Sequence, residues 1–149
     1  MSSHSIPHVL KHGDLKLEGE FVQGFNYTFL VQVTHEDETL RAVYKPQEGE
    51  RPLWDFPENT LAQREAAAYL VSDALGWDLV PATVYREDGP FGPGSVQFFI
   101  SHNPDYNYFN LRDEDFQRMP PVVVFDLLIN NADRKGSHLL FGDEGELWL

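Results

Sequence analysis

Polar and apolar residues alternate along the first third of the chain. Residues 15–21 place an apolar side chain or a glycine at every second position, which predicts a strand with one buried face. The alternation resumes after Gly24 and continues to Val33, so the two segments are expected to form a hairpin. Residues 40–45 then predict a third antiparallel strand, which ends at Pro46.

A change of pattern marks the middle of the chain. Thr60 followed by Gln63 is a capping-box signature, and residues 61–75 predict a helix that the next glycine ends. Residues 79–86 and 95–101 predict two further strands around a turn-rich segment. The chain up to this point therefore predicts about five antiparallel strands and one helix.

The last third of the chain combines an apolar helix with a polar loop. Residues 102–117 are polar and aromatic and predict a connector with at most a short helix. Residues 122–129 are nearly all apolar, which predicts a helix buried on most sides. A polar loop over residues 130–137 follows, and residues 138–141 with 147–149 predict a final hairpin.

Histidines recur every four residues near the N-terminus, at His4, His8 and His12. On a helix these side chains would line one face and could hold a metal ion. Pro7 and Gly13 argue against such a helix, so residues 1–14 are expected to form a flexible leader. Residues 15–101 and 102–149 then form the two parts of the remaining chain.

Composition narrows the class of protein. The chain has 149 residues, 42% of them hydrophobic, which suits one domain with one core. Its 11 basic and 24 acidic residues give a formal net charge of −13, which disfavours nucleic acids and anionic lipid surfaces as partners. Without cysteine there is no disulfide and no thiolate zinc site. No apolar run could span a bilayer as a transmembrane segment, and the N-terminus lacks a secretion signal, so we expect a cytoplasmic protein.

Lys45 and Glu65 form the first candidate site. Lys45 ends the third predicted strand, and Glu65 lies on the predicted helix with apolar neighbours three and four positions away on both sides. A carboxylate on such a stripe needs a cation, and Lys45 is expected to supply it. Two alternatives stay open: Arg64 and Glu65 mark the solvated edge of the helix, or Glu65 pairs with an arginine for stability alone.

A dense run of polar residues between two apolar elements forms the second candidate site, at residues 130–138. Such a loop is rigidly held and is a common place for catalytic groups. Asp133 can accept a proton from a hydroxyl nucleophile, and Arg134 and Lys135 can neutralise phosphate charge. His138 can bind a metal ion or orient a phosphate. The alternative is that the Asn and Asp side chains only cap the helix end and the turn.

The turn between the first two strands is the third candidate. Gly19 and Gly24 would let backbone amides approach a phosphate. A glycine in a hairpin loop more often serves the turn itself, so this feature is weak when taken alone.

The order of these features resembles the protein-kinase-like fold. A glycine-containing hairpin, a strand ending in lysine, a helix with an inward glutamate and an aspartate loop follow one another; in kinases the lysine and the glutamate pair over the nucleotide phosphates. More narrowly, the chain resembles the phosphatidylinositol 3- and 4-kinase-like family and, within it, a bacterial group of uncharacterised members. Residues 42–46, 50–57 and 130–138 carry the likeness, which extends from about residue 17 to the C-terminus.

The resemblance implies roles for individual residues. It implies that Lys45 contacts the nucleotide phosphates, that Glu65 positions Lys45, and that Asp133 is the base that orients the attacking hydroxyl. His138 stands where kinases usually place a metal-binding asparagine, although Mg²⁺ prefers oxygen ligands to imidazole. ATP and Mg²⁺ are the implied cofactors. Further nucleotide contacts are implied in the first hairpin turn and at the hinge that passes the adenine: Gly24, Phe25, Asn26, Phe98, Phe99, Ile100 and Ser101.

The implied fold is α+β: a kinase-like N-lobe over residues 15–101, with about five antiparallel strands and one helix, followed by the beginning of a helical C-lobe. The implied activity is an ATP-dependent phosphotransferase that moves the γ-phosphate to a hydroxyl of an unknown acceptor, which is a protein, a small molecule or a lipid. The chain ends before the second metal-binding aspartate of such kinases, so it looks truncated. The alternative is a pseudokinase, or a truncated nucleotide-binding or interaction module without catalysis.

Overall fold

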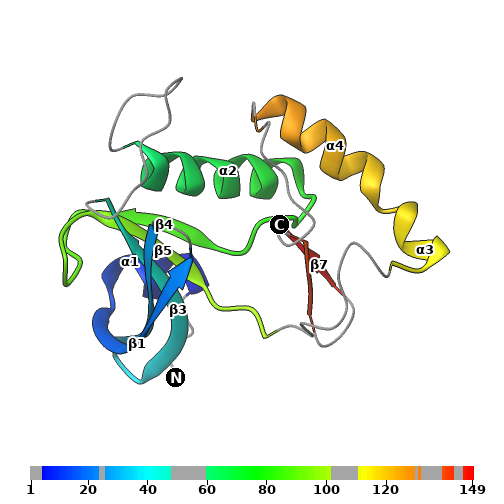
Figure 1. Cartoon of the computed structure of the whole chain (residues 1–149). Helices are drawn as coiled ribbons and strands as arrows, with labels where there is room; N and C mark the ends of the chain where they lie inside the picture. The colour runs from blue at the N-terminus through cyan, green and yellow to red at the C-terminus, as the bar shows by residue number, and fades with distance from the viewer. Residues whose placement is uncertain are drawn as a thin grey trace. The chain divides into compact units, whose positions relative to one another are not determined.

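Five strands form one antiparallel sheet in the computed structural model of the protein (Figure 1). The structure describes residues 5–23, 26–47, 60–101, 111–129, 131, 139–142 and 146–149. Its helices are α1 (Ile6–His12), α2 (Leu61–Leu75), α3 (Asp113–Phe116) and α4 (Met119–Leu128). Its strands are β1 (Asp14–Gln23), β2 (Asn26–His35), β3 (Glu38–Pro46), β4 (Thr83–Arg86), β5 (Gly94–Phe98), β6 (Leu140–Phe141) and β7 (Leu147–Trp148). The α+β class expected from the sequence is confirmed.

The chain divides into two compact units. The first contains Met1–Ala67 and Ala82–Phe99, and the second contains Ala68–Pro81 and Ile100–Leu149. The chain therefore passes between the units three times: inside α2, just before β4 and just after β5. Within the described residues, no helix is long and apolar enough to cross a membrane.

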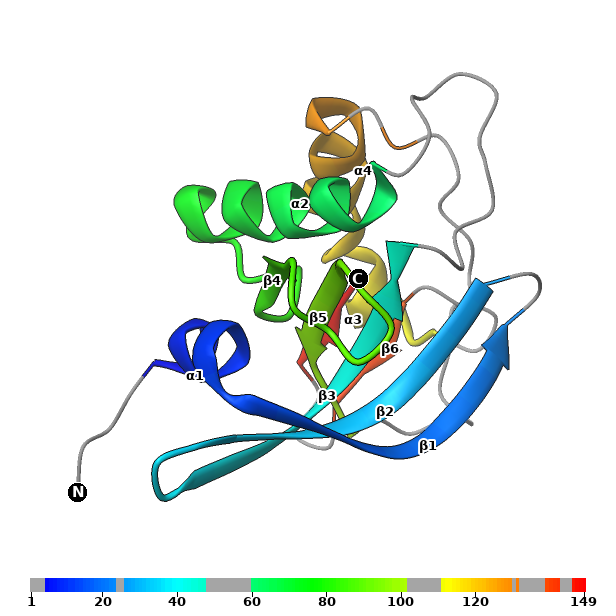
Figure 2. The ribbon, with the colours of Figure 1, turned by 90° about the vertical axis from the view of Figure 1, so that its left-hand side faces the viewer.

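The sheet of the first unit has the strand order β1-β2-β3-β5-β4 (Figure 2). β1 and β2 form the predicted hairpin, and the register between them shifts once, between Leu17 and Gly19. β2 and β3 join through a tight turn at Glu36, whose φ of 53° is left-handed. β3 therefore begins at Glu38, two residues before the predicted start. The five predicted antiparallel strands are confirmed.

The N-terminal segment contains a helix, so the expectation of a flexible leader over residues 1–14 is wrong for the described part. Pro7 lies in the first turn of α1, where a proline leaves no helical hydrogen bond unmade. Val9 and Leu10 are fully buried in the core against the sheet, and this burial stabilises the helix. Gly13 ends α1: its N–H donates to Val9 O at 2.8 Å, and a β-carbon there would lie only 2.6 Å from a valine methyl of β2.

Arg86 of β4 fastens α1 to the sheet. Its side chain is 5% exposed, and its Nη1 donates to Leu10 O at 3.1 Å and to Gly13 O at 2.6 Å. Its Nε and Nη2 each donate to one carboxylate oxygen of Asp88 at 3.0 Å. A strand residue thus bonds one of the last carbonyl groups of α1, which a helix cannot satisfy by itself, and the carbonyl of the capping residue Gly13.

Asp88 makes this attachment sensitive to acid. The hydrogen bonds from Arg86 hold the pKa of the Asp88 carboxyl below its ordinary value. Such a group adds stability above its unfolded pKa of about 3.9 and loses that stability as the pH falls through its folded pKa. We expect Asp88→Asn to lower the melting temperature slightly at about pH 6 and to have a smaller effect at about pH 2, because the wild-type carboxylate becomes protonated as the pH falls. Thermal unfolding across this range measures the effect; an equal difference at both ends contradicts it.

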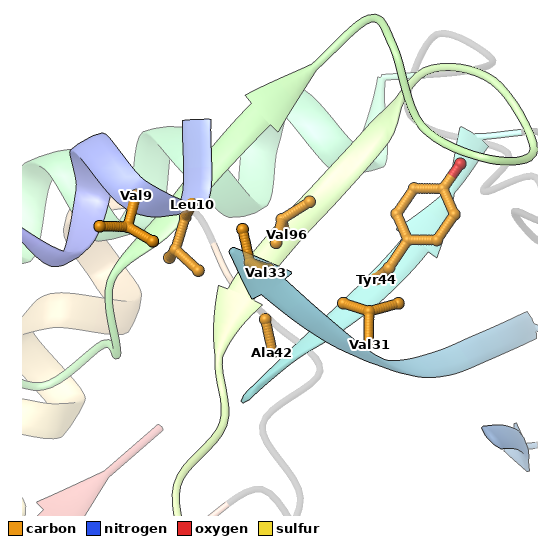
Figure 3. Close-up of a cluster of buried hydrophobic side chains, with 7 residues drawn as sticks. All are labelled: Val9, Leu10, Val31, Val33, Ala42, Tyr44 and Val96. Atoms are coloured by element: carbon orange, nitrogen blue, oxygen red, sulfur yellow. The ribbon is translucent and has the colours of Figure 1, made fainter. Parts of the chain in front are cut away.

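One hydrophobic core lies between α1 and the sheet (Figure 3). Seven buried residues form it: Val9, Leu10, Val31, Val33, Ala42, Tyr44 and Val96. The Tyr44 hydroxyl donates to Gly92 O at 2.6 Å and accepts from Phe91 N at 3.2 Å, which attaches the segment between β4 and β5 to the sheet. Burial raises the pKa of Tyr44, so the hydroxyl stays protonated at neutral pH. Gly89 passes so close that a β-carbon would overlap this hydroxyl.

The helix α2 spans the predicted residues, Leu61–Leu75, and Gly76 with a φ of 69° follows it. The buried hydroxyl of Ser72 accepts hydrogen bonds from the backbone N–H groups of Leu79 and the next residue, at 2.8 and 3.2 Å. Because these N–H groups are bonded to a side chain, they do not join the sheet. β4 therefore begins at Thr83, four residues after the predicted start.

The second unit has its own core. Seven buried residues form it: Leu79, Val80, Val122, Phe125, Leu139, Phe141 and Leu147. They come from the segment after α2, from α4 and from the region of strands β6 and β7, whose antiparallel pairing confirms the predicted final hairpin. Leu149 N donates to Leu79 O at 2.7 Å, which joins the hairpin to the segment after α2.

The helix α4 is apolar on both its buried and its exposed side. Val122 and Phe125 belong to the core and are 5% and 0% exposed. Four other aliphatic side chains are 45% to 76% exposed: Val123, Val124, Leu127 and Leu128. The predicted helix is confirmed, but the expectation that it is buried on most sides is wrong, because only one face of it meets the core.

Candidate functional site

Lys45 of β3 and Glu65 of α2 form an ion pair in the first unit. Lys45 Nζ lies 3.1 Å from Glu65 Oε1. Alternation along β3 explains the direction of the lysine: Tyr44 is buried in the core beside α1, so Lys45 extends from the opposite face. Glu65 reaches that face from the beginning of α2. The predicted pairing of Glu65 with Lys45, rather than with an arginine, is confirmed.

Ser95 of β5 bonds the other oxygen of the same carboxylate. Ser95 Oγ donates to Glu65 Oε2 at 2.8 Å, and Ser95 is 1% exposed. The register of β3 with β5 places Ser95 directly beside Lys45. Two adjacent strands therefore each supply one donor to Glu65, one charged and one neutral.

Sequence reasoning missed Ser95. A single serine within a strand carries no chemical signal of its own, because most such residues only satisfy local hydrogen bonds. The signal lies in the pairing of β3 with β5, which sets Ser95 beside Lys45. Pairing the third predicted strand with the fifth, and asking which small polar residue then lies opposite Lys45, would have identified Ser95.

The ion pair is accessible to solvent. The side chains of Lys45 and Glu65 are 40% and 39% exposed. An exposed pair of this kind adds about 0–1 kcal/mol to stability, so stability alone is a weak reason for it. An ammonium group held at the end of a strand and open to water can bind an anion such as a phosphate.

Further polar side chains line the same face of the sheet. Tyr85 lies on β4, the strand beyond β5, as the register partner of Ser95, and its hydroxyl donates to Gln47 Oε1 at 2.9 Å. Gln97 Nε2 donates to Thr83 Oγ1 at 2.9 Å. Hydroxyl and amide groups of β4 and β5 thus share this face of the sheet with Lys45, which suits a polar ligand better than an apolar one.

Several other predicted site residues lie outside the described residues: Gly24, Phe25, Asp133 and His138. Their roles stay predictions. Asn26 is the first residue of β2 and pairs across the hairpin with Gln23. The structure therefore brings together Lys45 and Glu65 of the predicted set and leaves the catalytic base untested.

Residues 98–101 end β5 and lead out of the first unit. The Phe98 side chain packs against the first core, and the N–H groups of Phe98 and Phe99 donate to carbonyl oxygens of the same unit at 2.8 and 3.0 Å. Ile100 is half-buried and Ser101 is exposed. The chain passes from the first unit to the second between Phe99 and Ile100. The implied contact of this segment with adenine stays a prediction.

Histidines gather beside α1. The ring centroids of His8 and His12 are 4.7 Å apart, and those of His8 and His35 are 5.0 Å apart. Even so, no group of three or more His, Asp or Glu side chains in the described part of the chain is arranged to hold a metal ion. His138, to which the resemblance gives metal binding, lies outside that part.

Comparison with known proteins finds a relative in Mycobacterium tuberculosis. The chain is 41% identical to Protein Rv2133c of that organism over 175 aligned residues, a match that covers 94% of the chain and 63% of the relative. The chain thus spans less than two-thirds of the length of that protein, whose name states no activity. No family model matches the chain. No solved structure matches it either.

Proposed function

We propose that the chain is the ATP-binding part of a phosphotransferase similar to the phosphatidylinositol 3- and 4-kinase-like family. The observation that carries the proposal is the ion pair of Lys45 with Glu65, at 3.1 Å. In protein kinases a lysine of the third strand pairs with a glutamate of the following helix, and this pair must be in place for transfer. Lys45 lies on the third strand of this chain, and Glu65 lies on the helix that comes next in the element order.

In the proposed reaction, an acceptor hydroxyl oxygen attacks the γ-phosphorus of ATP. The new oxygen–phosphorus bond forms as the bond to the β–γ bridging oxygen breaks, ADP leaves, and the hydroxyl proton passes to the carboxylate of Asp133. Lys45 binds phosphate oxygens throughout, and Glu65 keeps the ammonium group in place. Bound Mg²⁺ would neutralise phosphate charge, with His138 as the residue that the resemblance places near it.

The acceptor is a hydroxyl of a protein, a small molecule or a lipid. The net charge of −13 argues against docking on an anionic membrane surface, so the likeness to lipid kinases does not by itself favour a lipid. ATP as the donor fits the cytoplasmic location that the sequence predicts.

Nucleotide binding is testable by thermal unfolding followed by circular dichroism. ATP with Mg²⁺ at about a hundred times its Kd should stabilise the wild type by about 2.7 kcal/mol and raise the melting temperature by several degrees. Lys45→Ala should abolish this shift, because the phosphates lose their cation. Lys16→Ala is the matched control and should keep the shift, since Lys16 is an exposed lysine of β1.

Two other outcomes have defined meanings. A chain that responds to no nucleotide would contradict the proposal. Stabilisation by ATP that needs no Mg²⁺, and that Lys45→Ala removes, would favour the alternative of a pseudokinase or a nucleotide-binding module without catalysis.

A further inference from the structure

We infer that Ser95 is a positioning residue for the ion pair of Lys45 and Glu65. Its hydroxyl holds the Glu65 carboxylate toward the sheet, so that the pair is assembled before any nucleotide binds. The inference rests on the proposed function, because it describes how the same site is controlled.

The geometry holds Glu65 from two strands at once. Lys45 Nζ lies 3.1 Å from Glu65 Oε1, and Ser95 Oγ lies 2.8 Å from Glu65 Oε2. The two donors are register partners on adjacent strands. The terminal torsion of a glutamate is broad, so a carboxylate bonded at one oxygen can still rotate. Bonds at both oxygens restrict it to one orientation.

Burial makes the bond from Ser95 the firmer of the two. Lys45 and Glu65 are 40% and 39% exposed, so water competes for both ends of the ion pair. Ser95 is 1% exposed, and a buried hydroxyl without a partner is unfavourable. A short serine side chain also loses little conformational entropy on ordering. The bond from Ser95 therefore orients the carboxylate, and Lys45 pairs with it in that orientation.

The hydrogen bond from Ser95 to Glu65 affects when the ion pair of Lys45 and Glu65 forms. In protein kinases, the position of the helix that carries the glutamate decides whether the lysine–glutamate pair forms. In this chain, a hydrogen bond from Ser95 of β5 ties the glutamate of α2 to the sheet, and both partners of that bond belong to the protein. We therefore expect the nucleotide-free protein to hold the pair already formed.

The test is the rate at which an amine-acylating reagent labels Lys45 without nucleotide, measured by mass spectrometry. Lys16, an exposed lysine, serves as the reference within each sample. An amine held in an ion pair is labelled slowly. Ser95→Ala should raise the Lys45-to-Lys16 rate ratio roughly threefold or more, since one net hydrogen bond changes an equilibrium by about that factor. Ser95→Cys, which keeps the shape but donates weakly, should change the ratio in the same direction.

Thr39→Ala is the matched control, because Thr39 is an exposed hydroxyl residue of the same sheet, in β3, and belongs to none of the predicted nucleotide contacts. It should leave the ratio unchanged. An unchanged ratio in both Ser95 variants, with circular dichroism showing intact folding, would overturn the inference and leave Ser95 as a buried hydroxyl that serves stability only. If Ser95→Ala does not fold, Ser95→Cys decides alone.

Protection by ATP separates this inference from the proposed function. ATP with Mg²⁺ should slow the labelling of Lys45 in the wild type if the phosphates bind there. A changed ratio in Ser95→Ala without any protection by ATP would contradict the proposed function and support the positioning role. Protection by ATP with an unchanged ratio would contradict the positioning role alone.

Discussion

Replacing Arg86 with alanine should lower the free energy of unfolding by about 3 kcal/mol. The guanidinium is 5% exposed and donates to Leu10 O and Gly13 O at the end of α1. Without it, these carbonyl oxygens lose their side-chain donor, and each buried polar group left unpaired costs about 1–3 kcal/mol. Urea unfolding followed by circular dichroism measures the loss.

Arg41→Ala is the matched control for Arg86→Ala. Arg41 lies in the same sheet, but its side chain is 63% exposed and only approaches Glu18, at 3.5 Å. Exposed pairs contribute about 0–1 kcal/mol, so this variant should unfold nearly like the wild type. Equal losses in the two variants would show that Arg86 does not hold α1 in place.

Phe125→Ala should destabilise the second unit by about 3–5 kcal/mol. Phe125 is 0% exposed and lies in a core with Val122 and Phe141, so the truncation leaves a cavity as well as removing apolar contact. Leu127→Ala on the same helix should change the stability by less than about 0.5 kcal/mol, because Leu127 is 76% exposed. Denaturant unfolding measures the loss of stability in both variants. Similar losses would contradict the burial of Phe125 and the exposure of Leu127 on α4.

The elements that local sequence signals define were predicted well. Helix α2 has the predicted bounds, Leu61–Leu75, because a glycine able to adopt a left-handed φ follows it and its composition favours a helix. Strands β1, β2 and β3 follow from alternating polarity, since one face of the sheet is buried and the period of a strand is two.

The misassigned elements depend on contacts distant in sequence. The helix α1 depends on burial of Val9 and Leu10 and on the bonds from Arg86, which no local pattern reveals. β4 is short because Ser72 takes two backbone donors from the segment before it. The predicted burial of α4 was too high. An apolar composition shows that a helix can be buried, but it does not show how many of its sides have another element to pack against.

The candidate site was predictable only in part. The charged pair was predicted from residue type, because a glutamate among apolar helix neighbours was expected to be buried and to need Lys45 as its cation. The pairing is present, but the side chains are 40% and 39% exposed, so burial of the carboxylate is not its cause. Ser95 was not predictable, because its importance depends on the register between β3 and β5 and not on its own chemistry.

The outward side of α4 affects how unfolding of this protein should be measured. Fluorescent dyes that report melting do so by binding apolar surface, which most folded proteins conceal. Here the native state already presents the side chains of Val123, Val124, Leu127 and Leu128 to water. Such a dye should therefore fluoresce before the chain melts and flatten the transition, whereas circular dichroism reports the backbone and avoids this background.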